Sequence, residues 1–296
     1  DYGSTGEKRF FRGIILRSAT RNSNLESSSK LEICIYPDLW ALSVSQKSRV
    51  WKNVRAGDVL SELQTEYLKE ISDFASILDQ RLGVVGRARE AAIQWNESDF
   101  EFVSRLLERD GEYYAFHHDE YKSEIILLSH KYPVLKNFLP TKRLPFVPYD
   151  KSQENFFLDA ISACISEQKL TPKRYAVADY NPLNASIPLN YSSPIDIQSA
   201  FEVYDYPAEV ETISNLEEIS NRRLNAVKAR EDVYMLSSKC PLISAGHLVS
   251  AQTMFDEYDF LDLRPTQVVH ELVRDDNNVP HYINWFEAID AGKQYS

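Results

Sequence analysis

Glycine is scarce in this sequence. Only 9 of the 296 residues are Gly, which leaves little material for the glycine-rich loops that hold phosphate groups. The sequence contains no P-loop, no GxGxxG and no GxSxG nucleophile elbow, so nucleotide chemistry and acyl transfer through such a serine are poorly supported. The run from Gly83 to Gly86 resembles the GxxG clamp for single-stranded nucleic acid, but the acidic balance of the chain favours a plain turn.

Cysteine is also rare. The three copies, Cys34, Cys164 and Cys240, lie far apart and form no CxxC spacing, so the sequence predicts neither a zinc site nor a disulfide framework. We expect them to be small buried apolar residues. The densest set of possible metal ligands is the run His117–Glu120, which we interpret as a solvated turn because no second ligand pair at helical spacing completes it.

Long hydrophobic runs and basic clusters are missing as well. The longest aliphatic stretch, Ile125–Leu128, is far too short to cross a bilayer, and the N-terminus shows no signal-sequence pattern. We therefore expect no transmembrane segment and assembly in the cytoplasm. The formal net charge of -11, from 44 acidic and 33 basic side chains, argues against broad binding to phosphate backbones. Nucleic acid is not an expected partner, and the acidity is interpreted as a contribution to solubility.

The apolar content is sufficient for more than one core, since 43% of the 296 residues are hydrophobic. Segments Phe10–Arg17 and Leu31–Val44 predict two strands joined by a polar loop, with Pro37 marking a bulge or an edge position. Segment Val54–Lys69 has the apolar spacing of a helix face, and a second short helix is expected at Ile71–Leu82.

A well-specified helix is predicted from Ser98 to Asp110. Ser98 and Glu101 form an S-x-x-E capping box, and Gly111 stands where a left-handed C-terminal cap is favoured. The predicted apolar stripe consists of Phe100, Val103, Leu106 and Leu107, and the predicted solvent-facing residues are Glu101, Arg105, Glu108 and Arg109. With a preceding strand at Ala92–Trp95 and later strands at Tyr113–Phe116 and Glu124–Leu128, this predicts an α+β domain.

The second half of the chain predicts mostly strands. We expect them at Ala163–Ser166, Arg174–Asp179, Phe201–Tyr206, Gly246–Met254, Gln267–Arg274 and His281–Ile289. A helix is expected at Asn215–Glu231, with Leu216, Ile219, Leu224 and Val227 as its apolar positions. Short strands with polar turns and one inserted helix indicate a small β-barrel.

The order of motifs resembles the VgrG spike proteins of type VI secretion systems, which are related to the baseplate hub and late control proteins of contractile phage tails. The central match is Gln94–Phe116, and the flanking matches are Phe11–Ile15, Tyr36–Leu42, Ser48–Trp51, Glu202–Pro207 and Asn284–Ile289. The residues that carry this signature are Trp40, Ser98, Asp99, Phe100, Glu101, Leu106, Leu107, Gly111, Tyr113, Tyr114, Tyr204, Asp205, Tyr206, Pro207, Phe286 and Glu287. The resemblance covers nearly the whole chain.

The resemblance implies a mainly β, α+β fold with two small β-barrels, the first of them incomplete, flanking an α+β domain. The implied first half of the chain consists of the second half of the first barrel (residues 1–45) and the α+β domain (46–130). A proline-rich connector (131–160) then leads to the second barrel (161–290), which has an inserted helix at 215–231. Residues 291–296 are implied to begin a link to a needle domain. Because the chain starts at Asp1 and lacks a needle repeat, we expect it to be an excerpt of a longer protein or to have a separate needle.

The resemblance also implies a structural function. It implies a homotrimer whose paired barrels form a pseudo-sixfold ring, with a hexameric tube protein, a needle domain or baseplate proteins, and effectors as partners. Such a protein is exported with the spike without a signal peptide. No catalytic residue, cofactor or metal ligand is expected.

Two other functions remain open at this point. A cell-wall glycosidase would need two carboxylates in a cleft, and the 44 acidic residues of the chain are too many for one pair to stand out. A carbohydrate- or effector-binding module could use the abundant tyrosines, such as Tyr204 and Tyr206.

Overall fold

The structure is a computed structural model, and it describes residues 9–22, 29–67, 69, 71, 87–118, 120, 123–129, 142–147, 159–181, 184–194, 199–210, 212–252, 260–274 and 279–293. It forms two compact units. Residues 10–128 make the α+β unit, and residues 129–296 with residues 1–9 make the barrel unit. The helix expected at 71–82, the GxxG run and most of the connector expected at 131–160 lie outside the described residues.

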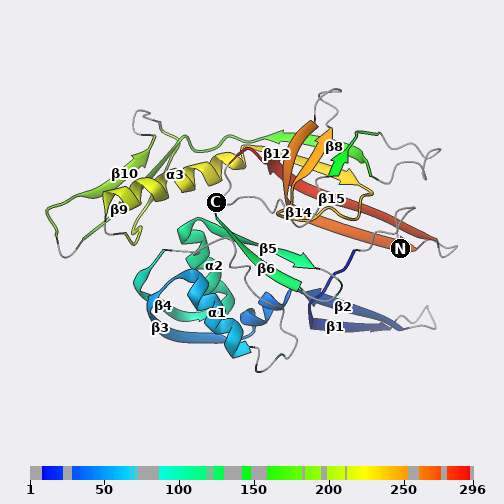
Figure 1. Ribbon diagram of the computed structural model, residues 1–296, viewed down its shortest axis with the longest axis horizontal. Coiled ribbons are helices and arrows are strands. Elements are labelled where there is room, and N and C mark those ends of the chain that lie inside the picture. The colour runs from blue at the N-terminus through cyan, green and yellow to red at the C-terminus, as the bar shows by residue number, and fades with distance from the viewer. Residues whose placement is uncertain are drawn as a thin grey trace. The chain divides into compact units, whose positions relative to one another are not determined.

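Among its described residues, the α+β unit contains three two-stranded sheets, β1–β2, β3–β4 and β5–β6, together with two α-helices. Its elements in chain order are β1 (Ile14–Asn22), β2 (Ser29–Tyr36), the 3-10 helix η1 (Asp38–Ser43), β3 (Gln46–Val54), α1 (Ala56–Tyr67), β4 (Arg89–Ser98), α2 (Asp99–Asp110), β5 (Glu112–His118) and β6 (Ser123–Ser129) (Figure 1). The helices α1 and α2 were both predicted from their apolar spacing, within two residues at each end.

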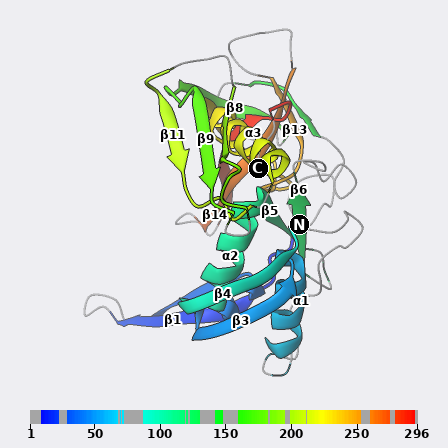
Figure 2. The same ribbon diagram turned by 90° about the vertical axis from the view of Figure 1, so that its left-hand side faces the viewer.

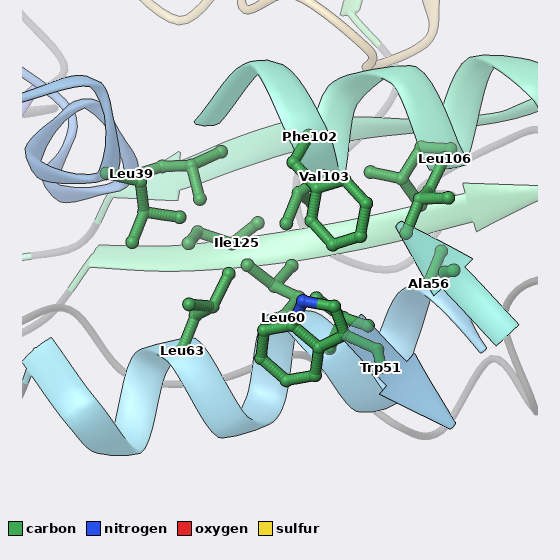
Figure 3. Close-up of a cluster of buried hydrophobic side chains, with 13 residues drawn as sticks. Leu39, Trp51, Ala56, Leu60, Leu63, Phe102, Val103, Leu106 and Ile125 are labelled. Atoms are coloured by element: carbon green, nitrogen blue, oxygen red, sulfur yellow. The ribbon is translucent and has the colours of Figure 1, made fainter. Parts of the chain in front are cut away.

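A hydrophobic core holds the α+β unit together. Leu60 and Leu63 of α1 and Phe102 and Leu106 of α2 point toward one another, with Ile125 of β6 between the two helices (Figure 3). All five side chains are almost fully buried. Burial of one such side chain stabilises the fold by about 1.5–3 kcal/mol relative to leaving it exposed, so this cluster supplies much of the driving force for folding of the unit.

Two predictions for the α+β unit are corrected by the structure. The strand expected at Leu31–Val44 ends at Tyr36, because Pro37 begins a 3-10 helix instead of a bulge. The apolar stripe of α2 was misplaced at one position: Phe102 is fully buried, whereas Phe100 is only half-buried. Strand β3 was not predicted, since its nine residues include only three apolar ones, Val50, Trp51 and Val54, and these do not alternate with polar residues.

The barrel unit contains a six-stranded sheet in the order β7-β13-β14-β15-β12-β8. These strands are β7 (Lys142–Leu144), β8 (Ile161–Gln168), β12 (Asp232–Ser238), β13 (Val249–Gln252), β14 (Phe260–Arg274) and β15 (Pro280–Asp290). A bridge between Phe146 and Ile161 joins the two outer strands, and Val147 N donates to Ile161 O at 2.8 Å. The sheet therefore closes on itself around a core that includes Leu263 and Phe286.

A smaller sheet and a helix are inserted into this barrel. Strands β8 and β12 are antiparallel neighbours, and Gln168 at the end of one faces Asp232 at the start of the other. Between them lie β9 (Arg174–Asp179), β10 (Leu189–Ser193), β11 (Glu202–Asp205) and α3 (Ile213–Ala229), with the strand order β10-β9-β11. We call this segment, residues 169–231, the insertion.

The predicted fold class is confirmed: the chain is α+β and mainly β. In the barrel unit, β9 and α3 lie close to their predicted positions, while β7, β10 and β12 were not predicted. Strand β14 begins seven residues before the predicted Gln267, at Phe260. Cys164 and Cys240 are buried as expected, Cys34 is only half-buried, and all three are free thiols.

Candidate functional site

The signature residues do not converge on one site. Most of them surround α2 in the α+β unit, a second group lies along β11 in the insertion, and a third lies on β15 of the barrel.

The helix α2 begins and ends as its sequence predicts. Ser98 Oγ accepts a hydrogen bond from Glu101 N at 3.1 Å, and Ser98 N donates to Glu101 Oε2 at 2.8 Å. The hydrogen bonds from Ser98 lower the pKa of Glu101. Gly111 has a φ of 67°, the left-handed conformation that glycine adopts most readily, and its N–H bonds to Glu108 O at 3.0 Å.

Asp99, the first residue of α2, is fully buried. Its carboxylate accepts hydrogen bonds from Gln94 Nε2 at 2.8 Å and from Tyr67 OH at 3.0 Å, and Lys47 Nζ lies 3.1 Å away. Burial by itself would raise the pKa of this carboxyl, but these hydrogen bonds and the cations Lys47 and Arg49 together lower it below the ordinary value of 3.8. The carboxylate therefore ties α2 to α1, β3 and β4.

Glu66 completes this ionic network at the surface. It forms ion pairs with Lys47 Nζ at 2.9 Å and with Arg49 Nη1 at 2.8 Å. The hydrogen bonds from Arg49 and Lys47 lower the pKa of Glu66. Because Glu66 and Asp99 are both held as carboxylates at neutral pH, neither fits the proton donor of a glycosidase, which needs a raised pKa.

The other end of α2 is fixed by a second buried carboxylate. Asp110 receives two hydrogen bonds from the Arg89 guanidinium, at 2.7 and 2.9 Å, and a third from Arg87 N at 2.9 Å. Both members of the Asp110–Arg89 pair are almost fully buried. Sequence reasoning missed this pair, since an acidic residue at a helix end is ordinarily solvated and no fixed spacing relates it to Arg89.

The aromatic signature residues of the α+β unit pack together on one side of α2. The ring of Trp40 lies 5.0 Å from that of Phe100 and 5.9 Å from that of Phe116, and Tyr114 contacts Phe116 at 5.5 Å. Burial raises the pKa of Tyr114. Tyr113 is half-buried, and Leu106 and Leu107 lie in the core. These residues act as packing groups.

The signature residues of the barrel unit differ in exposure. Tyr204 and Tyr206 are exposed, whereas Asp205 forms an ion pair with Arg223 of α3. Pro207, which follows a cis peptide bond, is exposed.

The two signature residues on β15 point to opposite sides of the sheet. Phe286 is buried in the barrel core, and the exposed Glu287 accepts a hydrogen bond from Thr266 Oγ1 at 3.2 Å.

Metal-ligand clusters and membrane-spanning helices are both missing from the part of the chain that the structure describes. Those residues contain no group of three or more His, Cys, Asp or Glu side chains arranged to hold a metal ion. None of the described helices combines the length and the apolar character that crossing a membrane requires. Asp119 of the His117–Glu120 run lies outside the described residues.

Comparison with known proteins agrees with the observed fold. The sequence profile of the phage tail baseplate hub (GPD) family matches residues 2–276. Type VI secretion system spike protein VgrG1b of Pseudomonas aeruginosa is 25% identical over 247 residues, which cover 82% of this chain and 32% of that protein. The chain thus spans about a third of the length of this relative.

Two solved structures share the fold. A component of the Escherichia coli type VI secretion system, described as structurally similar to the T4 bacteriophage tail proteins gp27 and gp5, aligns with a TM-score of 0.64 at 16% identity, covering 100% of this chain and 64% of that chain. A tail protein from Neisseria meningitidis MC58 aligns with a TM-score of 0.64 at 11% identity, covering 95% of this chain and 80% of that chain.

These findings confirm the resemblance that was based on Gln94–Phe116 and its flanking motifs. The profile match extends from residue 2 to residue 276 and includes residues of both units. The chain belongs to the phage tail baseplate hub (GPD) family.

Proposed function

We propose that the chain is the hub of a contractile injection machine, in which three copies form a pseudo-hexameric ring between a hexameric tube and a puncturing needle. The observation that carries this proposal is the baseplate hub family match over residues 2–276. The relatives named as type VI secretion spike proteins favour a secretion machine over a catalytic function. Baseplate proteins and effectors are the further partners that such a hub would contact.

Exposed apolar faces on both units support assembly. On β1–β2, four exposed side chains share one face of the ribbon: Ile15, Leu31, Ile33 and Ile35. On the barrel, Ile165 lies opposite Met235 on neighbouring strands and Val269 lies opposite Trp285, and all four side chains are exposed. Contiguous exposed apolar patches of this kind mark interaction sites. A closed ring of three identical chains needs two different contact faces on each chain.

The test is the mass of the assembly in solution. Light scattering coupled to size exclusion should give the mass of a trimer, and a strictly monomeric particle at high protein concentration would contradict the proposal. Ile33→Asp on β2 and Ile165→Asp on β8 should each shift the trimer toward monomer without unfolding the chain. Ile187→Asp in the insertion introduces the same charge at another exposed isoleucine and serves as the matched control, with the trimer retained.

Export follows from the same proposal. A hub of this kind would be assembled in the cytoplasm and leave the cell with the spike. Detection of the chain in culture medium only when the contractile apparatus is intact would support it, whereas equal release without the apparatus would contradict it.

A further inference from the structure

The insertion joins the barrel where β8 ends and β12 begins. Gln168 and Asp232 are paired at this position, and Gln168 Nε2 donates to Asp232 Oδ1 at 3.0 Å. Next to them, Lys169 N donates to Glu231 O at 2.8 Å. Within the insertion, β9 and β11 lie side by side, and α3 packs against β9 (Figure 2). We call the four residues Gln168, Lys169, Glu231 and Asp232 the neck.

A second segment, which follows β15, is also fixed to the barrel. We call it the exit turn, residues 290–293, because the chain leaves the barrel sheet there. Lys293 N donates to Asp290 O at 3.1 Å, and Ala291 N donates to Asp262 O of β14 at 2.9 Å. The backbone of the exit turn is therefore tied both to itself and to the barrel sheet.

The carboxylate of Asp232 joins the neck to the exit turn. Its Oδ1 accepts the hydrogen bond from Gln168, and its Oδ2 forms an ion pair with Lys293 Nζ. The side chains of Asp232 and Lys293 are 28% and 30% exposed, so the pair is partly shielded from water. The hydrogen bond from Lys293 lowers the pKa of Asp232, which keeps this group a carboxylate at neutral pH. The two segments are thus bonded to opposite oxygens of one side chain.

An apolar contact connects the same two segments. Ala229, the last residue of α3, shares a buried cluster with Val233 and Ile289. Val233 directly follows the neck, Ile289 directly precedes the exit turn, and the two residues are paired between β12 and β15. Because buried side chains are close-packed, a displacement of one is transmitted to its neighbours. The neck and the exit turn therefore share a charged and an apolar connection.

We propose that the neck and the exit turn are energetically coupled, so that an ordered exit turn stabilises the attachment of the insertion, and an ordered neck stabilises the exit turn. Because a coupling free energy is reciprocal, a change made in either segment should be felt in the other. The coupling lies within the barrel unit of one chain and needs no assembly. Its use rests on the proposed function: in a hub, a load on the segment that follows Lys293 would reach the insertion.

The test removes one contact and measures amide hydrogen exchange at the other, in the whole chain, by mass spectrometry of short peptides. Lys293→Met deletes the ammonium group and should speed exchange at the neck by about threefold, as expected for the loss of a partly exposed ion pair. Gln168→Ala should in turn speed exchange in the exit turn. Lys169→Met is the matched control, because Lys169 lies in the neck but pairs with Glu167 at 3.5 Å. It should leave exchange in the exit turn unchanged.

A double-variant cycle separates coupling from two independent contacts. Once Gln168 is replaced, adding Lys293→Met should speed exchange at the neck less than it does in the parent chain, because both contacts act through Asp232. Three results would each overturn the coupling: unchanged exchange at the neck in Lys293→Met, effects that simply multiply in the double variant, or equal acceleration in all barrel strands.

Light scattering of the same variants measures assembly separately. A trimeric mass without coupled exchange would contradict the coupling and leave the hub proposal standing. Coupled exchange in a strictly monomeric particle would support the coupling and contradict the hub.

Discussion

The α+β unit and the barrel unit bury their polar groups in different ways. In the α+β unit, two buried carboxylates, Asp99 and Asp110, fix the two ends of α2 through bonds to cationic or hydroxyl partners. In the barrel, the buried Asn284 and Arg264 donate to the neutral carbonyls of Cys240 and Ala291. The helix α2 is thus oriented by a few strong, directional hydrogen bonds and ion pairs, whereas the barrel is stabilised by sheet closure and apolar packing.

The largest effect is expected from Leu106→Asp in α2. Leu106 is 2% exposed in the core of the α+β unit, so the variant places an unpaired charge among apolar side chains and should lower the free energy of unfolding by about 4 kcal/mol or more. Urea unfolding followed by circular dichroism would measure this loss. The exposed Glu108→Ala on the same helix is the control, and unchanged stability of Leu106→Asp would show that the wrong face of α2 has been assigned to the core.

Breaking the buried ion pair should have the next largest effect. Asp110→Ala leaves the Arg89 guanidinium buried without its carboxylate, which should lower the free energy of unfolding by about 3–5 kcal/mol. Replacing both residues, as Arg89→Leu/Asp110→Leu, should recover part of that loss because no unpaired charge remains. A double variant as unstable as Asp110→Ala would show that packing, and not the charge, dominates at this position.

In the barrel, by contrast with the buried ion pair, a variant can remove apolar atoms alone. Leu263 is fully buried in the barrel core, and Leu263→Ala should lower the free energy of unfolding by about 2–5 kcal/mol through lost burial and the cavity left behind. Since no charged group is involved, the loss should be the same at neutral and at mildly acidic pH. Hydrogen exchange would localise the destabilisation to the barrel strands, and slow exchange throughout β14 and β15 would contradict the prediction.

Acid should weaken the α+β unit through Asp99. The pKa of Asp99 is lowered in the folded protein, so the unfolded chain takes up a proton first as the pH falls. Its contribution to stability is therefore complete above about pH 5 and is lost as the pH drops through the folded pKa. In the Asp99→Asn variant, the free energy of unfolding should therefore change less with pH between about pH 5 and about pH 2. If the free energy of unfolding changed with pH equally in Asp99→Asn and in the parent chain, other carboxyls would be responsible for the acid sensitivity.

Local sequence signals predicted some of this architecture and missed the long-range part. The capping box of Ser98 and Glu101 was predictable because both of its bonds lie within four residues. The burial of Asp99 was not, since it depends on Tyr67 and Lys47, which approach only after the sheet and helices pack. An acidic residue after a capping serine therefore indicates a helix start and says nothing of its burial.

The barrel shows the same limit of local information. Periodicity predicted β9 and α3, but closure of the barrel depends on the pairing of Phe146 with Ile161, for which no local spacing gives a signal. The pairing of Gln168 with Asp232, which defines the insertion, spans an even longer stretch of sequence. The family resemblance supplied the barrel architecture that residue patterns alone left open.

The N-terminal caps of α2 and α3 provide the comparison between the units with the smallest expected change in stability. Ser98 and Glu101 exchange two hydrogen bonds, at 3.1 and 2.8 Å, whereas Thr212 Oγ1 at the start of α3 accepts one bond from Asn215 N at 3.3 Å. Ser98→Ala should therefore lower the free energy of unfolding by about 1–2 kcal/mol, and Thr212→Ala by about 0.5–1 kcal/mol. Urea unfolding of both variants measures the difference. A larger loss for Thr212→Ala would show that the single bond at α3 contributes more to the free energy of unfolding than the reciprocal pair at α2. The orientation of α2 would then depend on Asp99 and Asp110.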